Sequence, residues 1–384
     1  MEFKLDGNEL RLIFVGEINS ATAASVEEDV NKTLEGKQFE KLILDFEKVV
    51  YVSSAGLRII LKLKQKYKDV SIINASLEVY DVLQMTGFTN LMEIKKALAV
   101  VDVTGCEIIG TGYYSKVYRI NKDTIIKVYE RQNDIKEIER ELNLCKQAFI
   151  LGIPTAISFD IVKVNDKLGV RFEMLDSHSL RDLFVNYPER FDELCAKYAN
   201  LLKKINTTES TDETLPDAKK EWFKKLEAIQ PYLDVEDFFK CRELLKGIPY
   251  RKTFIHGDCH VKNIMVQGDE LFLIDMDTLS IGHPIFELAA IYATYCAFEE
   301  DIPGNNEVFL KMNGELTRKM YIQILKDYFD NYNEDILNKI RIVSYIHMMW
   351  WDLTFEPESL KHLDKSNKKL AELLKQYNDL DIGA

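Results

Sequence analysis

Hydrophobic and polar residues alternate at the start of the chain, and the alternation then changes to a helical period. Residues 2–16 alternate on either side of Asp6-Gly7-Asn8, a pattern that predicts two strands joined by a tight turn. The helical period that follows predicts an amphipathic helix from about Ala21 to Leu34, with Ser20 as its N-cap. The chain is therefore expected to open with a mixed α/β unit.

The same unit is expected to continue with further strands and helices of alternating type. The predicted elements are a strand at 41–46, an apolar segment at 49–52, a helix from the Ser53-Ser54 turn to about Tyr67, a strand at 70–74 and a helix at 77–85. We expect these elements to form a first domain over residues 1–98.

A different order of elements begins near Thr104. From Glu107 the pattern is strand, glycine-rich turn, strand, strand and helix, and after about Ser179 it is mostly helical. The intervening residues 97–103 fit either a last strand or a connecting piece. We expect a second domain over 104–384, with a small β-rich lobe at about 104–174 and a larger helical lobe at about 178–384. The predicted fold class is therefore α+β.

Composition excludes several classes of partner and location. The chain has 384 residues and a formal net charge of −13, so its field repels polyanions, and neither nucleic acid nor an anionic membrane is expected as a main partner. No segment approaches the ~18 apolar residues of a membrane span, and the charged start does not fit a signal peptide. The six cysteines lack a metal-ligand spacing. We therefore expect a cytoplasmic protein with reduced thiols.

The residue pattern that indicates chemistry lies in the second half of the chain. The segment His256-Gly257-Asp258-Cys259-His260-Val261-Lys262-Asn263 is followed, after a short hairpin, by Asp275. A carboxylate at Asp258 can accept the proton of an attacking hydroxyl, while Asn263 and Asp275 supply oxygen ligands for Mg²⁺ on nucleotide phosphates. The alternative is a surface turn that contains polar residues by chance.

A second pattern, Gly110-Thr111-Gly112-Tyr113-Tyr114-Ser115-Lys116-Val117, lies between two apolar strands. Glycine permits a close approach of the backbone, so the turn at Gly110, Gly112 and Ser115 can fold over the phosphates of ATP. A glycine-rich turn alone is an ordinary hairpin, but Ile125-Ile126-Lys127-Val128 follows at a kinase-like distance. An unpaired ammonium inside this apolar run would cost free energy, which favours a functional Lys127.

Together these residues resemble the aminoglycoside phosphotransferase and choline kinase branch of the protein-kinase-like fold. The resemblance covers nearly all of residues 104–384 and implies a two-lobed kinase fold that uses ATP and Mg²⁺. It implies that Asp258 is the catalytic base and that Asn263 and Asp275 bind the metal. Lys127 resembles the strand lysine that contacts the α- and β-phosphates.

The resemblance also implies the nucleotide contacts of the small lobe. Glu141 resembles the helix partner of the strand lysine, with Glu137 and Glu139 as competing candidates. Residues Glu173 to Leu175 resemble the hinge between kinase lobes, whose backbone meets adenine.

Two features of the large lobe bear on the acceptor. About ten residues separate Asp275 from the next predicted helix, which leaves no room for a long activation loop and favours a small-molecule hydroxyl as substrate. Glu287 stands where the family usually has Asp, and we expect it to be structural. The acidic residues Glu299 to Asp301 either bind a cationic substrate or form a solvated acidic loop.

The first domain resembles the STAS domain of anti-sigma-factor antagonists over about residues 1–98. The segments that show this are Val52-Ser53-Ser54-Ala55-Gly56-Leu57-Arg58 and Leu83-Gln84-Met85-Thr86-Gly87-Phe88. The resemblance implies phosphorylation at Ser54, although Ser53 replaces the preceding Asp of many members. The alternative is that Ser54 is an ordinary N-cap.

The sequence thus predicts an ATP- and Mg²⁺-dependent kinase that phosphorylates an alcohol, with a small-molecule hydroxyl as acceptor and a regulatory protein as partner of the STAS domain. One alternative is a signalling kinase that phosphorylates a STAS-domain serine, either Ser54 or the serine of a partner. Another is a scaffold without catalytic activity, which the complete set of Lys127, Asp258, Asn263 and Asp275 disfavours.

Overall fold

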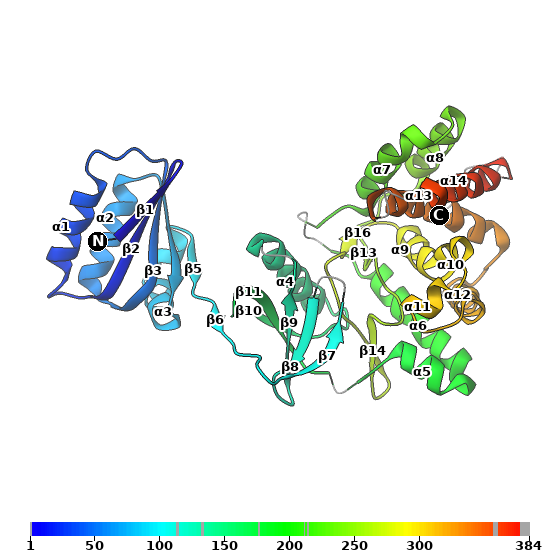
Figure 1. Ribbon diagram of the computed structural model, residues 1–384, viewed down its shortest axis with the longest axis horizontal. Coiled ribbons are helices and arrows are strands. Elements are labelled where there is room, and N and C mark those ends of the chain that lie inside the picture. Colours follow the sequence, from blue (N-terminus) through cyan, green and yellow to red (C-terminus); the bar gives the residue numbers. More distant parts are fainter. Residues whose placement is uncertain are drawn as a thin grey trace. The chain divides into compact units, whose positions relative to one another are not determined.

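The computed structural model describes residues 2–112, 115–131, 134–175, 177–210, 212, 215–355 and 360–376 (Figure 1). Contacts within the chain divide it into two units. The first comprises Met1–Asp102 with Val162–Asp166, and the second comprises Val103–Ile161 with Lys167–Ala384. Within the described residues, no helix has the length and apolar character needed to cross a bilayer.

The first unit is a sheet with helices, as the alternating pattern predicted. The sheet has the strand order β1-β2-β3-β4-β5, in which β1 is antiparallel to β2 and the other pairs are parallel. The strands of this sheet are β1 (Glu2–Asp6), β2 (Glu9–Ile18), β3 (Lys41–Val52), β4 (Asp69–Ala75) and β5 (Ile94–Lys96), and the unit also contains strand β6 (Ala99–Val100). Its helical elements are α1 (Ala23–Leu34), α2 (Ser54–Lys66), α3 (Leu77–Met85) and a 3-10 turn at Phe88–Asn90.

The core of the first unit lies between this sheet and its helices. Leu10, Leu12 and Phe14 alternate with less buried residues along β2, as a strand with one buried face requires. Strand β1 is exposed along its whole length. The hairpin prediction around Asp6-Gly7-Asn8 is confirmed by the register of β1 and β2.

Two local predictions in the first unit need correction, and the structure decides one alternative that the sequence left open. The first helix begins at Ala23 rather than at Ala21, and its N-cap residue is Thr22 rather than Ser20. The predicted strand at 41–46 and the segment at 49–52 form the single long strand β3. Residues 99–100 form the short strand β6, which pairs in parallel with Val162 and Lys163. Of the two alternatives for residues 97–103, a strand or a connecting piece, the segment therefore contains a strand.

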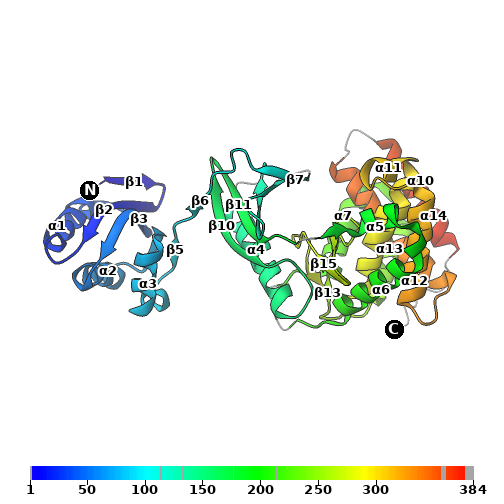
Figure 2. The same cartoon turned by 90° about the horizontal axis from the view of Figure 1, so that it is seen from below.

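The second unit begins with a small sheet that carries the predicted glycine-rich turn. Its strands follow the order β10-β11-β9-β8-β7, and helix α4 packs against the sheet through β11 (Figure 2). These elements are β7 (Glu107–Thr111), β8 (Ser115–Arg119), β9 (Thr124–Tyr129), α4 (Ile135–Ile150), β10 (Ser158–Val164) and β11 (Lys167–Glu173).

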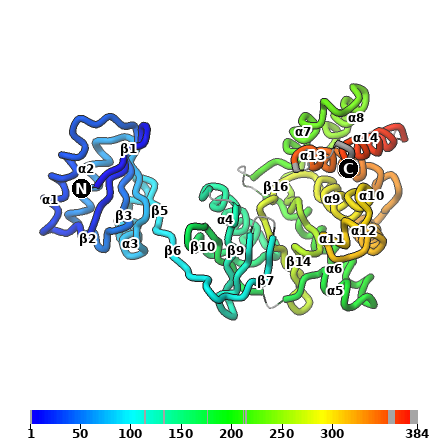
Figure 3. Tube along the Cα trace, viewed as in Figure 1, coloured from blue at the N-terminus to red at the C-terminus, as the bar shows by residue number. Residues whose placement is uncertain are grey.

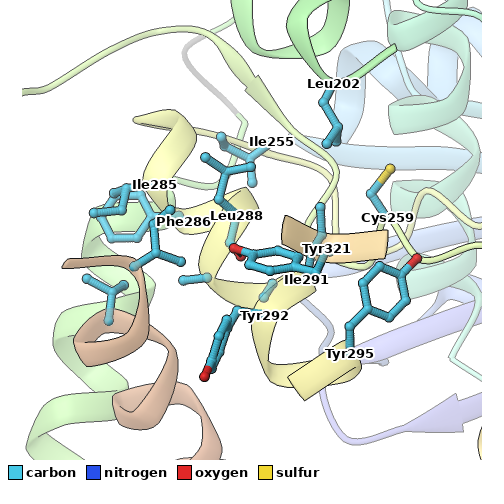
Figure 4. Packing of buried hydrophobic residues seen from close by; sticks show 14 of the residues in the cluster. Leu202, Ile255, Cys259, Ile285, Phe286, Leu288, Ile291, Tyr292, Tyr295 and Tyr321 are labelled. Atoms are coloured by element: carbon cyan, nitrogen blue, oxygen red, sulfur yellow. The ribbon is translucent and has the colours of Figure 1, made fainter. Parts of the chain in front are cut away.

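The rest of the second unit is mainly helical, as the sequence predicted after Ser179 (Figure 3). Its longer helices are α5 (Leu180–Asn186), α6 (Phe191–Thr207), α7 (Ala218–Ile229), α8 (Val235–Gly247), α9 (Pro284–Tyr292), α12 (Gly314–Tyr328), α13 (Glu334–Phe355) and α14 (Leu360–Lys375). A π-helical segment (Ala293–Ala297) and two short helices, α10 (Phe298–Asp301) and α11 (Asn305–Phe309), lie between α9 and α12. Large buried aromatic side chains pack in this core, among them Tyr198 and the residues Tyr295 and Tyr321 (Figure 4).

Two small sheets within the helical part hold the residues that the sequence singled out. The segment 256–263 connects β13 (Phe254–Ile255) to β14 (Ile264–Gln267), and Asp275 follows β15 (Glu270–Leu273). Strand β14 pairs with β15 and with β12 (His178–Ser179), while β13 pairs with β16 (Ser280–Ile281). Because these strands are largely buried, both ends of the 256–263 segment are fixed in the core.

Candidate active site

The structure brings together the side chains of Asp258 and Asn263. The Asn263 Nδ2 atom donates hydrogen bonds to Asp258 Oδ2 and to the Asp258 carbonyl, both at 3.0 Å. The carbonyl of Asn263 in turn accepts from the N–H of Ile274 at 3.0 Å. This hydrogen bond holds Asp275, the residue after Ile274, close to Asn263. The Asp258 side chain remains 44% exposed, so its carboxylate is accessible to a substrate.

Lys127 of β9 lies between two carboxylates. Its Nζ atom is 2.8 Å from Oε1 of Glu141 on α4 and 2.8 Å from Oδ1 of Asp275. Burial alone would lower the pKa of Lys127, but the carboxylates of Asp275 and Glu141 hold it well above its usual value. Among the three candidate acids of α4, Glu141 is therefore the partner of Lys127, while Glu137 pairs with Arg140 at 3.7 Å.

Asp275 combines an unusual backbone conformation with a crowded electrostatic setting. Its φ of 67° lies in the left-handed region, which a non-glycine residue adopts at a cost. Burial tends to raise its pKa, and the Lys127 ammonium outweighs that effect and lowers it. Burial and then the Asp275 carboxylate raise the pKa of Asp277 to about 7. The sequence analysis did not select Asp277, although it is part of the same motif.

The glycine-rich turn connects β7 to β8, as predicted. The N–H of Gly112 donates to the carbonyl of Ser115 at 2.8 Å, and a Cβ at Gly112 would lie 3.3 Å from Ser115 Oγ. A Cβ at Gly110 would meet Val117 at 3.5 Å, an ordinary contact. Tyr113 and Tyr114 lie outside the described residues. Glycine at 112 therefore has a local packing reason.

The predicted hinge lies at the end of β11, and two of its N–H groups already donate hydrogen bonds to other parts of the chain. The N–H of Glu173 donates to the carbonyl of Ile157, and the N–H of Met174 donates to the carbonyl of Asp123, both at 2.9 Å. The N–H of Leu175 has no hydrogen-bond partner among the residues that the structure describes. Of the N–H groups predicted to meet adenine, that of Leu175 is the available one.

Glu287 of α9 holds the backbone just ahead of Asp258. Its carboxylate accepts from the N–H of His256 at 2.5 Å and from the N–H of Gly257 at 3.2 Å, and the side chain is completely buried. Burial raises the pKa of Glu287 to about 7, against the opposing effect of these two hydrogen bonds. The expectation that Glu287 is structural agrees with these contacts, but the sequence did not reveal that they reach the segment of Asp258.

A tight contact on the opposite side of the segment explains its glycine. Gly257 has a φ of +84°, and a Cβ added there would lie 3.1 Å from the carbonyl oxygen of Thr278. The Thr278 hydroxyl donates to the carbonyl of His256 at 2.6 Å. A larger residue at 257 would therefore push apart the two strands of chain that carry Asp258 and Asp275.

Two buried tyrosines hold the segment beyond Asp258. The Tyr198 hydroxyl of α6 donates to the carbonyl of Cys259, and the N–H of Val261 donates to the Tyr295 hydroxyl at 2.9 Å. Tyr295 belongs to the π-helical segment and lies beside Cys259 (Figure 4). Its own carbonyl accepts from the side chains of Asn306 and Thr317. Sequence reasoning missed both tyrosines, because nothing in their neighbours marks them as different from core residues.

The acidic residues at 299–301 do not form the solvated loop that was one of the two expectations. The carboxylate of Glu299 accepts from the N–H groups of Gly304 and Asn306. Glu300 binds Arg318 at 2.7 Å and the Tyr345 hydroxyl at 2.8 Å, and Asp301 binds His362 at 2.5 Å. All three acids therefore bind groups of the chain itself.

The serine pair of the first unit has divided roles. The Ser53 Oγ atom accepts from the N–H of Ala55 at 3.2 Å, so Ser53 is the N-cap of α2. Ser54 is the first residue of the helix and is exposed. The alternative that Ser54 is the N-cap is therefore wrong. Gly56 is required here because a Cβ would lie 2.7 Å from the carbonyl oxygen of Ile18.

Comparison with known solved structures gives matches of low sequence identity. A choline/ethanolamine kinase family protein from Mesorhizobium loti is 11% identical, with 71% of this chain and 89% of that chain covered and a TM-score of 0.49. The ADP-bound aminoglycoside phosphotransferase APH(2″)-Ib is 14% identical, with 78% and 99% covered and a TM-score of 0.47. The streptomycin–ATP complex of APH(2″)-IIa is 16% identical, with 81% and 99% covered and a TM-score of 0.46.

Comparison with family models assigns both parts of the chain, whereas no curated protein matches it. The STAS domain model matches residues 3–101. The model of the phosphotransferase enzyme family matches residues 105–315, which is more than half of the 384 residues. The chain therefore belongs to the phosphotransferase enzyme family and carries a STAS domain ahead of its phosphotransferase domain.

Proposed function

We propose that this phosphotransferase uses Mg·ATP and transfers the γ-phosphoryl group to the hydroxyl of a small molecule. The observation that carries the proposal is the linked set of contacts between Asp258 and Asn263 and between Lys127, Glu141 and Asp275. These five residues come from four separate elements or loops of the second unit, and an arrangement of this kind suits phosphoryl transfer.

Asp258 is proposed as the base. In the reaction the acceptor oxygen forms a bond to the γ-phosphorus, the bond from that phosphorus to the leaving oxygen of ADP breaks, and the hydroxyl proton passes to the Asp258 carboxylate. The exposed carboxylate, held by Asn263 Nδ2 at 3.0 Å, is free to receive this proton.

Asn263 and Asp275 are proposed as the protein ligands of Mg²⁺. The fit rests on their chemistry, since amide and carboxylate oxygens are preferred by Mg²⁺. It also rests on the crowding of carboxylates, because Asp277 adds a second acid beside Asp275. When bound, Mg²⁺ would neutralise negative charge on the phosphates. Lys127 contacts Asp275 directly at 2.8 Å.

The small lobe is proposed to bind the nucleotide. Lys127, fixed by Glu141, would contact the α- and β-phosphates, and the turn at Gly110, Gly112 and Ser115 would cover them. The N–H of Leu175, for which the described residues supply no acceptor, would bind adenine, with Glu173 two residues before it in the same hinge. Support for these roles comes from the ion pair at 2.8 Å and from the remaining hinge donor.

A small molecule is favoured as acceptor by the short connection after Asp275. Residues between Asp275 and α9 include β16, which pairs with β13, so the connection is already committed to the core. We further propose that the STAS domain regulates the enzyme through a partner protein.

The test is Asp258→Asn, with Asp269→Asn as the matched control, because the Asp269 side chain is 94% exposed and lies in a hairpin turn. We expect Asp258→Asn to retain ATP binding and to lower kcat by about 10²–10⁴-fold, the usual contribution of a general base. ADP release over a panel of alcohols and thermal shift with Mg·ATP measure the two properties. Unchanged turnover in Asp258→Asn would contradict the proposal, and absence of nucleotide binding would favour the scaffold alternative.

A second candidate function, phosphorylation of a STAS-domain serine, is favoured by one observation. Ser54 is exposed and is not needed as the helix cap, because Ser53 fills that role. A phosphate there would meet free N–H groups and the favourable end of the helix dipole. Mass spectrometry after incubation with Mg·ATP is expected to find phosphate at position 54 in the wild type and none in Ser54→Ala. An unmodified Ser54 in an enzyme that is active on small alcohols would exclude self-phosphorylation.

A further inference from the structure

Three cationic side chains gather beside the proposed base. Lys262 belongs to the same segment as Asp258, Arg181 lies in the first turn of α5, and Lys311 follows α11. The N–H of Arg181 donates to the carbonyl of Val261, the neighbour of Lys262, at 3.1 Å. Lys262 Nζ donates to the carbonyl of Phe309, two residues before Lys311, at 3.3 Å. We call Arg181, Lys262 and Lys311 the cationic patch.

The patch is connected to Asp258 through side chains as well as through the backbone. Lys262 Nζ lies 4.7 Å from the centre of the Phe309 ring, and the His260 ring meets the same phenyl ring edge to face at 5.3 Å. His260 Nε2 is 3.6 Å from Asp258 Oδ2. Phe309 is 42% exposed, so the surface beside the base combines positive charge with an accessible aromatic ring.

The positive charge of the patch is poorly compensated by the chain. Lys262 and Lys311 form no ion pair with the described residues, and both are exposed. Arg181 contacts Asp182 at 3.0 Å, but its Nε is buried without a hydrogen-bond partner in the described structure. Partial burial and then the positive charges of Arg181 and Lys311 lower the pKa of Lys262, against the opposing attraction of Asp258. Such repulsion costs free energy that an anion bound at the patch would recover.

The backbone at Lys311 adds an independent sign of constraint. The non-glycine residues with positive φ in the described structure are Asn74, Asn165, Asp275 and Lys311. Asparagine and aspartate adopt this region more readily than lysine does. The exception among the four is therefore Lys311, a member of the patch. Strained backbone of this kind is found preferentially at binding sites.

The acids that could have bound a cationic acceptor are already engaged. Glu299, Glu300 and Asp301 bind backbone N–H groups, Arg318, tyrosine hydroxyls and His362. In the described structure these three acids are therefore not available to a cationic acceptor. In a chain with a net charge of −13, a local positive patch is also what an anionic substrate needs to approach the site.

We propose that the acceptor is an anionic alcohol, whose carboxylate or phosphate binds Arg181, Lys262 and Lys311 while its hydroxyl faces Asp258. This inference rests on the proposed function, since it names the class of substrate for the same site. The transfer itself is unchanged, so the anionic group of the acceptor takes no part in bond making.

The test uses four three-carbon alcohols that differ mainly in charge: glycerol, serinol, glycerate and glycerol 3-phosphate. ADP release with Mg·ATP is measured for each. We expect kcat/KM for glycerate or glycerol 3-phosphate to exceed that of neutral glycerol and cationic serinol by about tenfold or more, as charge-assisted hydrogen bonds allow. The preferred member of the anionic pair tells a carboxylate site from a phosphate site.

The variant that links this preference to the patch is Lys262→Met. It should raise KM for the anionic alcohol about tenfold and change KM for ATP less than about twofold. Lys319→Met is the matched control, since Lys319 also places its ammonium over a phenyl ring, that of Phe191 at 4.5 Å, but lies on α12. Lys311→Met is the second patch variant, in case Lys262→Met fails to fold.

Four outcomes overturn the inference. They are a preference for glycerol or serinol, no turnover of either anionic alcohol by an enzyme that binds Mg·ATP, a normal KM for the anionic alcohol in both patch variants, and a rise of the ATP KM alone. The last outcome would assign the patch to the nucleotide. Failure of the proposed function has a different signature, the absence of Mg·ATP binding, and it would remove this inference as well.

Discussion

Two regions of the phosphotransferase domain hold their functional side chains in different ways. Lys127 is held through its own ammonium, which lies 2.8 Å from Glu141 and 2.8 Å from Asp275. Asp258 keeps a carboxylate that is 44% exposed and that accepts one hydrogen bond from Asn263, and buried groups hold the backbone on either side of it. Charged side chains fix the first region, and buried polar groups that contact main-chain atoms fix the second.

The difference follows from the role that we propose for each side chain. A lysine that contacts phosphates can be oriented by carboxylates, because its three N–H donors serve several partners at once. A base has to leave its carboxylate free to accept a proton. Its position therefore depends on Glu287 before it and on Tyr198 and Tyr295 after it. Mutations in the first region are therefore expected to lower stability by leaving charges unpaired. Mutations in the second region are expected to lower kcat as well, by changing the position of Asp258.

The largest effect is expected where charge holds the side chain. Lys127→Met leaves two acids without their cation, and Glu141 is only 9% exposed, so we expect a loss of about 3 kcal/mol in the free energy of unfolding. Urea denaturation measures it. The double variant Lys127→Met/Glu141→Gln should lose less than the sum of the single variants, because it removes the unpaired acid. A loss below about 1 kcal/mol would show that the pair contributes little to stability.

Glu287→Gln tests the support ahead of the base. The amide retains one acceptor but turns an N–H group toward a backbone N–H, so we expect a loss of about 2 kcal/mol in stability and about tenfold in kcat. KM for ATP should change little, because Glu287 contacts only the segment of Asp258. A variant with normal kcat and reduced stability would make Glu287 a core residue without influence on the base.

The same residue predicts a pH dependence of stability. Burial raises the pKa of Glu287 from the ordinary 4.5 to about 7, so the folded protein binds this proton more tightly than the unfolded chain. Between these pH values the unfolded chain has lost the proton and the folded protein keeps it. The contribution of Glu287 to stability is therefore present below pH 4.5 and is lost as pH rises toward 7. We expect the free energy of unfolding, measured by urea denaturation at several pH values in this range, to change less with pH in Glu287→Gln than in the wild type. An equal dependence on pH in the two proteins would contradict the assignment.

Tyr295→Phe gives a smaller effect beyond the base. It removes the acceptor of the Val261 N–H, for which we expect a loss of about 1–2 kcal/mol and a several-fold lower kcat. Tyr321→Phe is the matched control, since Tyr321 is equally buried and its hydroxyl donates to the carbonyl of Leu288 at 2.9 Å, away from the Asp258 segment. Similar stability losses with a lower kcat only in Tyr295→Phe support positioning. Equal kcat values in the two variants would refute it.

The two regions also differ in how far the sequence could predict them. The residues of the charged region stand in recognisable surroundings: Lys127 lies in an apolar strand, and Asp275 follows one. The order of strands and helices could likewise be predicted from hydrophobic periods, because burial sets those periods directly. The match of residues 105–315 to the phosphotransferase enzyme family agrees with the family resemblance that these residues indicated.

The support of the base could not be predicted in the same way. Tyr198 and Tyr295 lie in apolar helical segments, and only the folded chain shows that their hydroxyls face Cys259 and Val261. The choice of Glu141 over Glu137 likewise needs the rotation of α4 about its axis, which three acids within five residues leave open. Contacts between distant segments depend on packing, which a local pattern does not contain.

The smallest effects are expected in the STAS domain, where the two neighbouring serines Ser53 and Ser54 have different roles. Ser53→Ala removes the side chain that caps α2, and we expect a loss of about 1 kcal/mol in stability. Ser54→Ala should change stability by less than about 0.5 kcal/mol, because Ser54 is exposed at the first helical position and alanine is favourable there. Thermal and urea denaturation of the two variants measure the difference. If Ser54→Ala were the more destabilising variant, Ser54 would be needed for folding, and its exposure would no longer argue for a role as phosphoacceptor.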